Sequence, residues 1–172
     1  MDVRLAIASR REVRQYTAEP LREEVVERIL DAGRLAGSAQ NRQPWSLVVL
    51  ASRERLERLA SCVFAPDNLL GAALVVALVV RGKGPVAFDA GRAAQNMLLQ
   101  AWADRVGACP NGIADADGVR SVLDLAGEDE RVAIVVSFGH AARPRHPSSR
   151  SAEEWSGRAN RRPLEDVVRR LA

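Results

Sequence analysis

One long segment of the chain constrains the fold more than any other. Residues 88–107, FDAGRAAQNMLLQAWADRVG, predict a helix with Ala, Leu, Met or Trp on almost every side. Such a helix has to be covered all round. Two arrangements are open. The helix is either the core of a single chain, or it lies at the centre of a homodimer interface, where a second copy supplies part of the cover.

Three short apolar runs predict buried strands around this helix. They span residues 45–52, 73–80 and 131–139, and each is rich in Val, Leu or Ile. The sequence ACPNG at 108–112 predicts a turn, and the Pro-, Ser- and Arg-rich residues 141–157 predict a loop or extended arm.

Helical patterns separate the strands. Pro20 should open a helix whose buried stripe is Val26, Ile29, Leu30 and Gly33. Further helices are predicted at residues 3–9, 52–61 and 116–127, with a short amphipathic helix or docked tail at 161–171. Because helices and strands alternate irregularly, the expected fold class is α+β, a mixed sheet flanked by helices.

The 172 residues predict one domain, 1–172, with a single core. Cys62 and Cys109, the only two cysteines, cannot form a disulfide framework and suggest no zinc site, so a reducing cytoplasm is expected. The longest apolar run, GAALVVALVV, is too short to span a membrane. The net charge of +3 comes from arginines interleaved with acids, which is typical of solvated helix faces and not of a nucleic-acid binder.

The segment RREVRQY carries the first candidate site. Arg10, Arg11 and Arg14 would lie within one and a half helical turns, where three guanidinium groups could hold one phosphate. The alternative is a solvated basic turn.

The segment SAQNRQPW carries the second candidate site. Ser38, Asn41 and Gln43 offer hydroxyl and amide groups to the edge of a heterocycle, just before the strand that starts at Trp45. The alternative is an ordinary turn between a helix and a strand.

In this order, the segments RREVRQY, SAQNRQPWSLVVL, DAGRAAQNMLLQAWADRVGACPNGI and RVAIVVSFGH resemble the motifs of the nitroreductase family. The resemblance implies an α+β flavoprotein with its long central helix at a homodimer interface and two bound FMN molecules. It further implies hydride transfer from NADH or NADPH to an electron-poor small molecule such as a nitroaromatic or a quinone. Since the flavin carries that chemistry, no catalytic side chain and no metal are expected.

The resemblance also assigns roles to individual residues. Arg10, Arg11 and Arg14 would hold the FMN phosphate, while Ser38, Asn41 and Gln43 would approach the cofactor from the subunit that contributes their loop. A backbone N–H in the turn Pro110, Asn111, Gly112 would meet the reactive flavin nitrogen. Arg161 would complete the phosphate site, with Arg158 and Arg162 as near alternatives, and Asn68 is a loosely aligned candidate for the pyrimidine edge.

Two features depart from the family pattern. Glu12 stands where the family usually has a small polar residue, and its carboxylate would repel a phosphate. It could instead turn outward and orient Arg11 or Arg14. Only RGKGPVAF, residues 81–88, separates the second strand from the long helix, which predicts an open flavin face.

Other functions stay open at this point. A similar flavin fold could dehalogenate, oxidise rings or fragment the flavin, and a flavin or deazaflavin carrier would need no reaction at all. An Arg-rich nucleic-acid binder is disfavoured because no aromatic residues are interleaved with the arginines. His140 and His146 lack a Ser or Cys partner for a hydrolytic triad, and Cys109 is more simply a small buried thiol.

Overall fold

The computed structural model describes residues 1–171. Its chain divides into two compact units, a larger one at Arg11–Arg145 and a smaller one that joins Met1–Arg10 to the segment from His146 onward.

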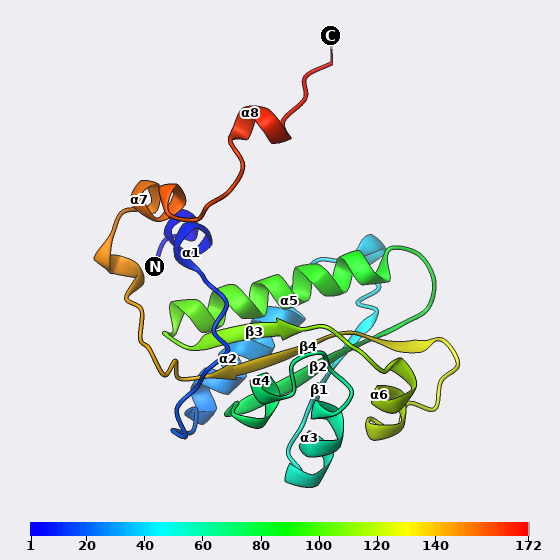
Figure 1. The fold of residues 1–172 in the computed structure, drawn as a ribbon. Coiled ribbons are helices and arrows are strands. Elements are labelled where there is room, and N and C mark those ends of the chain that lie inside the picture. The colour runs from blue at the N-terminus through cyan, green and yellow to red at the C-terminus, as the bar shows by residue number, and fades with distance from the viewer. Residues whose placement is uncertain (172) are drawn as a thin grey trace. The chain divides into compact units, whose positions relative to one another are not determined.

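A four-stranded antiparallel sheet forms the centre of the larger unit (Figure 1). Its strands are β1 (Trp45–Val49), β2 (Leu74–Arg81), β3 (Gly107–Asn111) and β4 (Glu130–Gly139), in the order β1-β2-β4-β3. The inner strand β2 is buried from Leu74 to Val80, as expected for an apolar strand covered on both faces.

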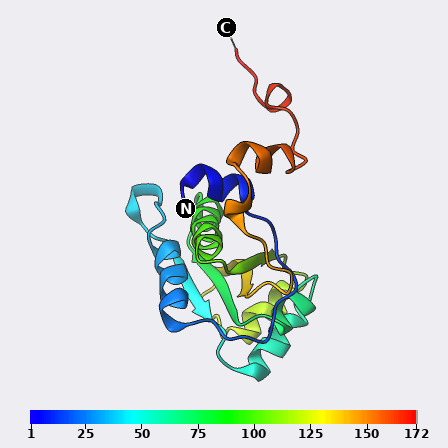
Figure 2. The same ribbon diagram turned by 90° about the vertical axis from the view of Figure 1, so that its left-hand side faces the viewer.

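Helices cover both faces of this sheet. Helices α2 (Glu23–Arg34) and α5 (Val86–Ala103) lie on one face, and α3 (Arg53–Ala60), α4 (Asp67–Leu70) and α6 (Ala116–Val122) lie on the other (Figures 1 and 2). Because side chains alternate along a strand, Val76 of β2 packs with the α2/α5 layer and Val75 packs with the opposite layer. The predicted α+β fold class is confirmed.

One strand was not predicted from the sequence, and the burial of another was predicted wrongly. Residues 108–112 were predicted as a turn, but Gly107–Asn111 form β3, paired with Val135–Gly139 of β4. Pro110 is tolerated there because β3 is an edge strand, where a missing N–H breaks no inner ladder. Strand β1 was predicted as buried, but it is the other edge, and Ser46 and Val49 are exposed.

Helix α2 begins at Glu23, not at Pro20, and its buried positions are Val25, Ile29 and Gly33. Val26 and Leu30, predicted in the stripe, lie at its margin and are only partly buried.

The long helix α5 is not covered all round by its own chain. Ala90, Ala93, Met97 and Ala101 are fully buried, in agreement with the predicted core role. On another flank Ala87, Gly91 and Gln95 are exposed, and Phe88 keeps 68% of its surface exposed. We call Ala87, Phe88, Gly91 and Gln95 the open flank of α5.

The smaller unit contains α1 (Val3–Ser9), a 3-10 turn at Pro147–Ser149, α7 (Ala152–Gly157) and the single turn α8 (Leu164–Val167). Residues 141–157 were predicted to be irregular, but a capping box of Ser151 and Glu154 starts α7 within them. Trp155 anchors this unit, since its indole N–H donates to the Pro147 carbonyl at 2.7 Å. Among residues 1–171, no helix is both long and apolar enough to cross a membrane.

Candidate functional site

The arginine segment is extended, so the helical spacing predicted for Arg10, Arg11 and Arg14 is wrong. Helix α1 ends at Ser9, and the chain then runs beside the sheet. Glu12 forms a parallel bridge with Ala108 of β3, and Tyr16 forms an antiparallel bridge with Ala141. The N–H of Val13 donates to the Ala108 carbonyl at 3.0 Å. Strand-like partners outside the segment therefore replace the hydrogen bonds of a helical turn.

Two glycines allow this close approach. Gly107 and Gly139 face each other in the register of β3 and β4. A Cβ atom at Gly107 would lie 2.7 Å from the Val13 side chain, and one at Gly139 would lie 2.9 Å from the Tyr16 ring. A larger residue at either position would push the arginine segment off the sheet.

A basic cavity opens beside the segment. It measures about 260 Å³ and is lined by Arg14, Arg143 and Arg145 together with Glu12. Its volume is below the 300 Å³ or so of a typical whole-ligand pocket, but three guanidinium groups suit a phosphate group. Sequence reasoning missed Arg143 and Arg145, although their alternate spacing in ARPRH directly after a strand was a usable signal.

The second candidate segment is a strained loop between α2 and β1. Gln40, Asn41 and Gln43 have backbone φ values of 52°, 54° and 49°, which residues other than glycine rarely adopt. The Ser38 hydroxyl accepts the N–H of Gln43 at 2.8 Å, so part of its capacity is used within the loop. Asp89 of α5, which is only 3% exposed, accepts the N–H of Ala39 at 3.3 Å. Strain of this kind is concentrated at functional sites.

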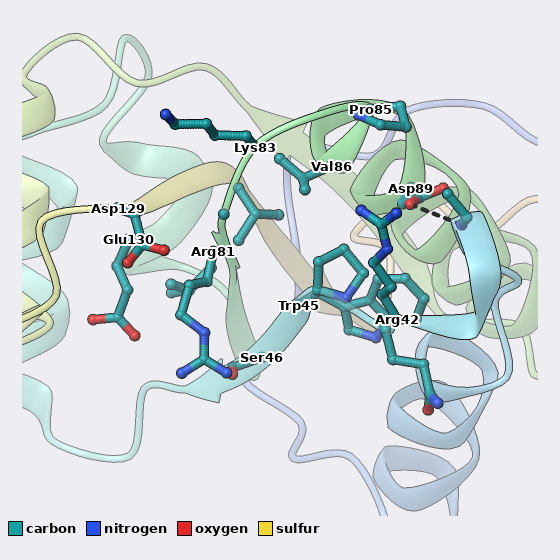
Figure 3. Close-up of a pocket in the computed structure, with 16 residues that line it drawn as sticks. Arg42, Trp45, Ser46, Arg81, Lys83, Pro85, Val86, Asp89, Asp129 and Glu130 are labelled. Atoms are coloured by element: carbon teal, nitrogen blue, oxygen red, sulfur yellow. Dashed lines mark hydrogen bonds between the residues drawn. The ribbon is translucent and has the colours of Figure 1, made fainter.

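A second cavity, of about 310 Å³, lies between this loop and the end of β2 (Figure 3). Arg42, Trp45, Lys83 and Asp89 are among the side chains that line it. Its cationic groups are matched by Asp89, Asp129 and Glu130, so its charge favours neither an anion nor a cation.

The predicted turn at Pro110, Asn111 and Gly112 lies where β3 ends. Asn111 is 3% exposed, and its side chain points into the protein, where its Nδ2 donates to the Cys109 carbonyl at 2.9 Å. Gly112, the first residue after the strand, is exposed, and its carbonyl accepts the N–H of Phe64 at 3.1 Å. The exposed backbone at Gly112 is thus the part of this turn that a ligand can reach.

Behind the turn, four side chains form a connected series that we call the polar chain: Asn68, Asn111, Ser137 and Tyr16. Nδ2 of Asn68 donates to Oδ1 of Asn111 at 2.9 Å, and Nδ2 of Asn111 donates to Oγ of Ser137 at 3.1 Å. Oγ of Ser137 lies 3.0 Å from Oη of Tyr16, and Oη of Tyr16 donates to the Val13 carbonyl at 2.7 Å.

The polar chain changes the interpretation of two residues. Asn68 was a candidate for the flavin edge, but it is 7% exposed and its amide nitrogen is directed at Asn111. Tyr16 was not expected to have a role. Burial raises the pKa of Tyr16 far above its ordinary value, so its hydroxyl stays protonated and available as a donor.

Arg11 belongs to the larger unit but is not among the residues that line the basic cavity, and its predicted role in phosphate binding stays a prediction. The remaining predicted phosphate ligands belong to the smaller unit. Arg10 caps the end of α1, where its backbone N–H donates to the Ala6 carbonyl. Arg158, Arg161 and Arg162 are exposed, and Arg162 donates to the Asp166 carbonyl at 2.7 Å. Roles for Arg10 and Arg161 in phosphate binding stay predictions.

Comparison with known proteins gives consistent matches. A family model described as the nitroreductase family matches residues 7–74 and 67–140. A relative from Methanothermobacter thermautotrophicus named "Putative NADH dehydrogenase/NAD(P)H nitroreductase" is 32% identical over 136 residues, which are 73% of this chain and 70% of that protein.

Solved structures agree in fold. A nitroreductase family protein from Clostridium difficile 630 superposes with a TM-score of 0.83 at 21% identity, over 98% of both chains. A protein from Desulfovibrio desulfuricans, solved in complex with FMN, superposes with a TM-score of 0.79 at 28% identity, over 100% of this chain and 98% of that one.

Proposed function

Because the chain belongs to the nitroreductase family, we propose that it is an FMN-dependent oxidoreductase that uses NADH or NADPH to reduce an electron-poor small molecule. One observation carries the proposal. The basic cavity lies beside Glu12 and Val13, which contact Ala108, while the exposed turn begins four residues further along, at Gly112. Four residues of extended strand span roughly 13 Å. The ribityl phosphate alone is shorter than this, but a whole FMN molecule, with its isoalloxazine ring included, is longer, so one FMN molecule would reach both features.

The side chains around the cavity fit this cofactor. Arg14, Arg143 and Arg145 would neutralise the phosphate dianion, and guanidinium groups bind phosphate oxygens through paired hydrogen bonds. The exposed Asn41 and Gln43 would present amide groups to the polar edge of the flavin. When bound, FMN supplies the hydride chemistry, accepting hydride from the nicotinamide and passing it to the acceptor. The protein's part is to bind and orient the cofactor and to leave one of its faces accessible.

A homodimer completes the proposal. The open flank of α5 exposes Phe88 beside Gly91, and an added Cβ at Gly91 would meet nothing within 4 Å. Exposed apolar surface on a helix that is otherwise buried is typical of a protein interface. A second copy packed on this flank would supply the missing cover, and its loop with Ser38, Asn41 and Gln43 would complete the cofactor site.

A reducing compartment, the cytoplasm, is the proposed setting. Cys62 and Cys109 are both buried and unbridged. Free buried thiols of this kind persist where thiols are kept reduced.

Anaerobic titration of the FMN-loaded protein with NADH and with NADPH tests the proposed activity. At least one nicotinamide should bleach the flavin absorbance, and a quinone or nitroaromatic added afterwards should restore it. A yellow protein that neither nicotinamide bleaches would overturn the reductase assignment.

Arg14→Ala tests the cavity. Losing one charged phosphate contact should weaken FMN binding about tenfold to a hundredfold, with little change in the binding of riboflavin, which has no phosphate. Arg58→Ala on the surface of α3 removes an equal charge away from the cavity and is the matched control. Equal losses in both variants would mean that overall charge, and not the cavity, binds the phosphate.

A further inference from the structure

The polar chain links helix α4 to the arginine segment through the interior of the larger unit. It starts at Asn68, crosses β3 at Asn111 and β4 at Ser137, and ends where Tyr16 meets the carbonyl of Val13. Asn68, Asn111 and Ser137 are each at most 7% exposed. The last atom of the series belongs to the peptide group that connects Val13 to Arg14.

The first two hydrogen bonds of the polar chain have a fixed direction, because the amide nitrogens of Asn68 and Asn111 can only donate. At its other end, the Tyr16 hydroxyl donates to the Val13 carbonyl at 2.7 Å. Between them, Oγ of Ser137 lies 3.0 Å from Oη of Tyr16 and 3.3 Å from the Cys109 carbonyl. Hydrogen bonds connected in a buried site polarise and strengthen one another.

The end of the polar chain determines how the Val13–Arg14 peptide is oriented. No cis peptide bond occurs among residues 1–171, so the N–H of Arg14 points opposite to the Val13 carbonyl and away from Tyr16. Val13 and Arg14 both line the basic cavity. A carbonyl held toward Tyr16 therefore directs the Arg14 N–H away from the buried polar chain, in a peptide whose two residues both line the cavity.

Packing alone does not account for the polar chain. Burying four polar side chains is costly unless each finds a partner, and apolar residues of similar shape would fill the same space without that cost. Gly107 and Gly139 additionally leave room for Val13 and Tyr16 to lie directly on the sheet. The local sequence thus keeps this peptide at a fixed place and in a fixed orientation.

We propose that Tyr16 is a positioning residue for the phosphate site: the polar chain holds the Val13–Arg14 peptide so that the N–H of Arg14 donates to the flavin phosphate. The proposal rests on the proposed function, because it takes FMN as the ligand. It also gives Asn68 a role in phosphate binding, although Asn68 is connected to Val13 only through three other side chains.

Competition between FMN and riboflavin tests this positioning role. The 172-residue protein is dialysed against mixtures of the two flavins, and the bound fractions give the ratio of their affinities. Since riboflavin lacks the phosphate, the ratio reports the phosphate contribution alone. In Tyr16→Phe and in Asn68→Ala, the preference for FMN should fall about fivefold to tenfold, as expected when one hydrogen bond to a charged group is weakened.

Val119→Ala is the control for lost stability. Val119 is fully buried in the layer of α3, α4 and α6 and takes no part in the hydrogen bonds of the polar chain, so its truncation should destabilise the fold and leave the FMN preference unchanged. If Tyr16→Phe and Asn68→Ala weaken both flavins equally, or if Val119→Ala lowers the preference as much as they do, the polar chain is merely structural and the inference is wrong.

The outcome for the wild-type protein separates this inference from the proposed function. A protein that binds neither flavin overturns both. A protein that prefers FMN, and whose preference neither Tyr16→Phe nor Asn68→Ala changes, keeps the proposed function and overturns the positioning role alone.

Discussion

Tyr16 is the only tyrosine in the chain, which makes it directly observable. Its hydroxyl contacts the Ser137 hydroxyl and the Val13 carbonyl in a buried setting. Burial is the main cause that raises its pKa above the ordinary value of 10.0, because the charged phenolate would lose its hydration.

Ultraviolet titration should therefore find no tyrosinate at pH 11 in the folded protein, and a pKa of about 10 in denaturant. These two pKa values determine how the stability depends on pH. Above pH 10 the unfolded chain releases the proton and the folded one keeps it, so the free energy of unfolding falls as the pH rises. The difference in stability between wild type and Tyr16→Phe should shrink over the same range. Ionisation of Tyr16 near pH 10 in the folded protein would contradict the buried polar chain.

Glu12 is a second residue whose contribution can be measured, in this case through FMN binding. It is exposed and lines the basic cavity with Arg14, Arg143 and Arg145, so its carboxylate lies close to the proposed phosphate. Glu12→Ser should tighten FMN binding severalfold at low salt and less at high salt, because salt screens the repulsion. Fluorescence titration with FMN measures this, with Glu54→Ser on α3 as the charge-matched control. Weaker binding in Glu12→Ser would mean instead that Glu12 orients a neighbouring arginine.

At the scale of single elements, the loop between α2 and β1 stores backbone strain. Gln40, Asn41 and Gln43 all adopt positive φ, and Asp89 holds the loop through the N–H of Ala39. Three such residues within four positions cost of the order of 1 kcal/mol each or more. The loop is therefore held by its surroundings and not by its own preferences.

Paired substitutions at Gln40 test this strain. Gln40→Gly should leave the free energy of unfolding unchanged or raise it by up to about 1 kcal/mol, because glycine adopts this conformation freely. Gln40→Val should lower it by more than 1 kcal/mol, since a β-branched residue at positive φ is a steric outlier. Urea unfolding compares the two. Equal stabilities would show that the loop does not hold Gln40 in this conformation.

The elements that sequence could predict are those specified locally. Helix α3 follows from the Ser52 cap and its apolar spacing, and β2 follows from an uninterrupted apolar run. Strand β3 could not be predicted, because its Gly, Pro and Asn favour a turn and only pairing with β4 makes them a strand. The arginine segment likewise depends on a distant partner, Ala108. The spacing of Arg143 and Arg145 was visible in the sequence, but only the fold shows that they line the same cavity as Arg14.

At the scale of the whole molecule, α5 connects the core to the expected interface. The sequence predicts cover on every side of this helix, but the chain leaves the open flank with Phe88 and Gly91 exposed. This difference follows from the size of the chain, which has one sheet and one layer of helices on each face to offer.

Phe88→Glu should therefore convert a dimer to a monomer at micromolar concentration, because a desolvated carboxylate in an apolar interface is strongly unfavourable. Light scattering after size-exclusion chromatography measures the mass. Ser121→Glu adds the same charge to α6, on the opposite face of the sheet, and should leave the dimer intact. A wild-type protein that is monomeric at these concentrations would contradict the dimer proposal.

The absorbance spectrum of the purified protein is the most direct test of FMN binding. We expect the two visible bands of oxidised flavin, either as isolated or after FMN is added and the excess removed. The bound flavin released by heating should be FMN and not riboflavin. A folded protein that is colourless and retains no flavin after incubation with FMN would mean that this chain is not an FMN-dependent enzyme.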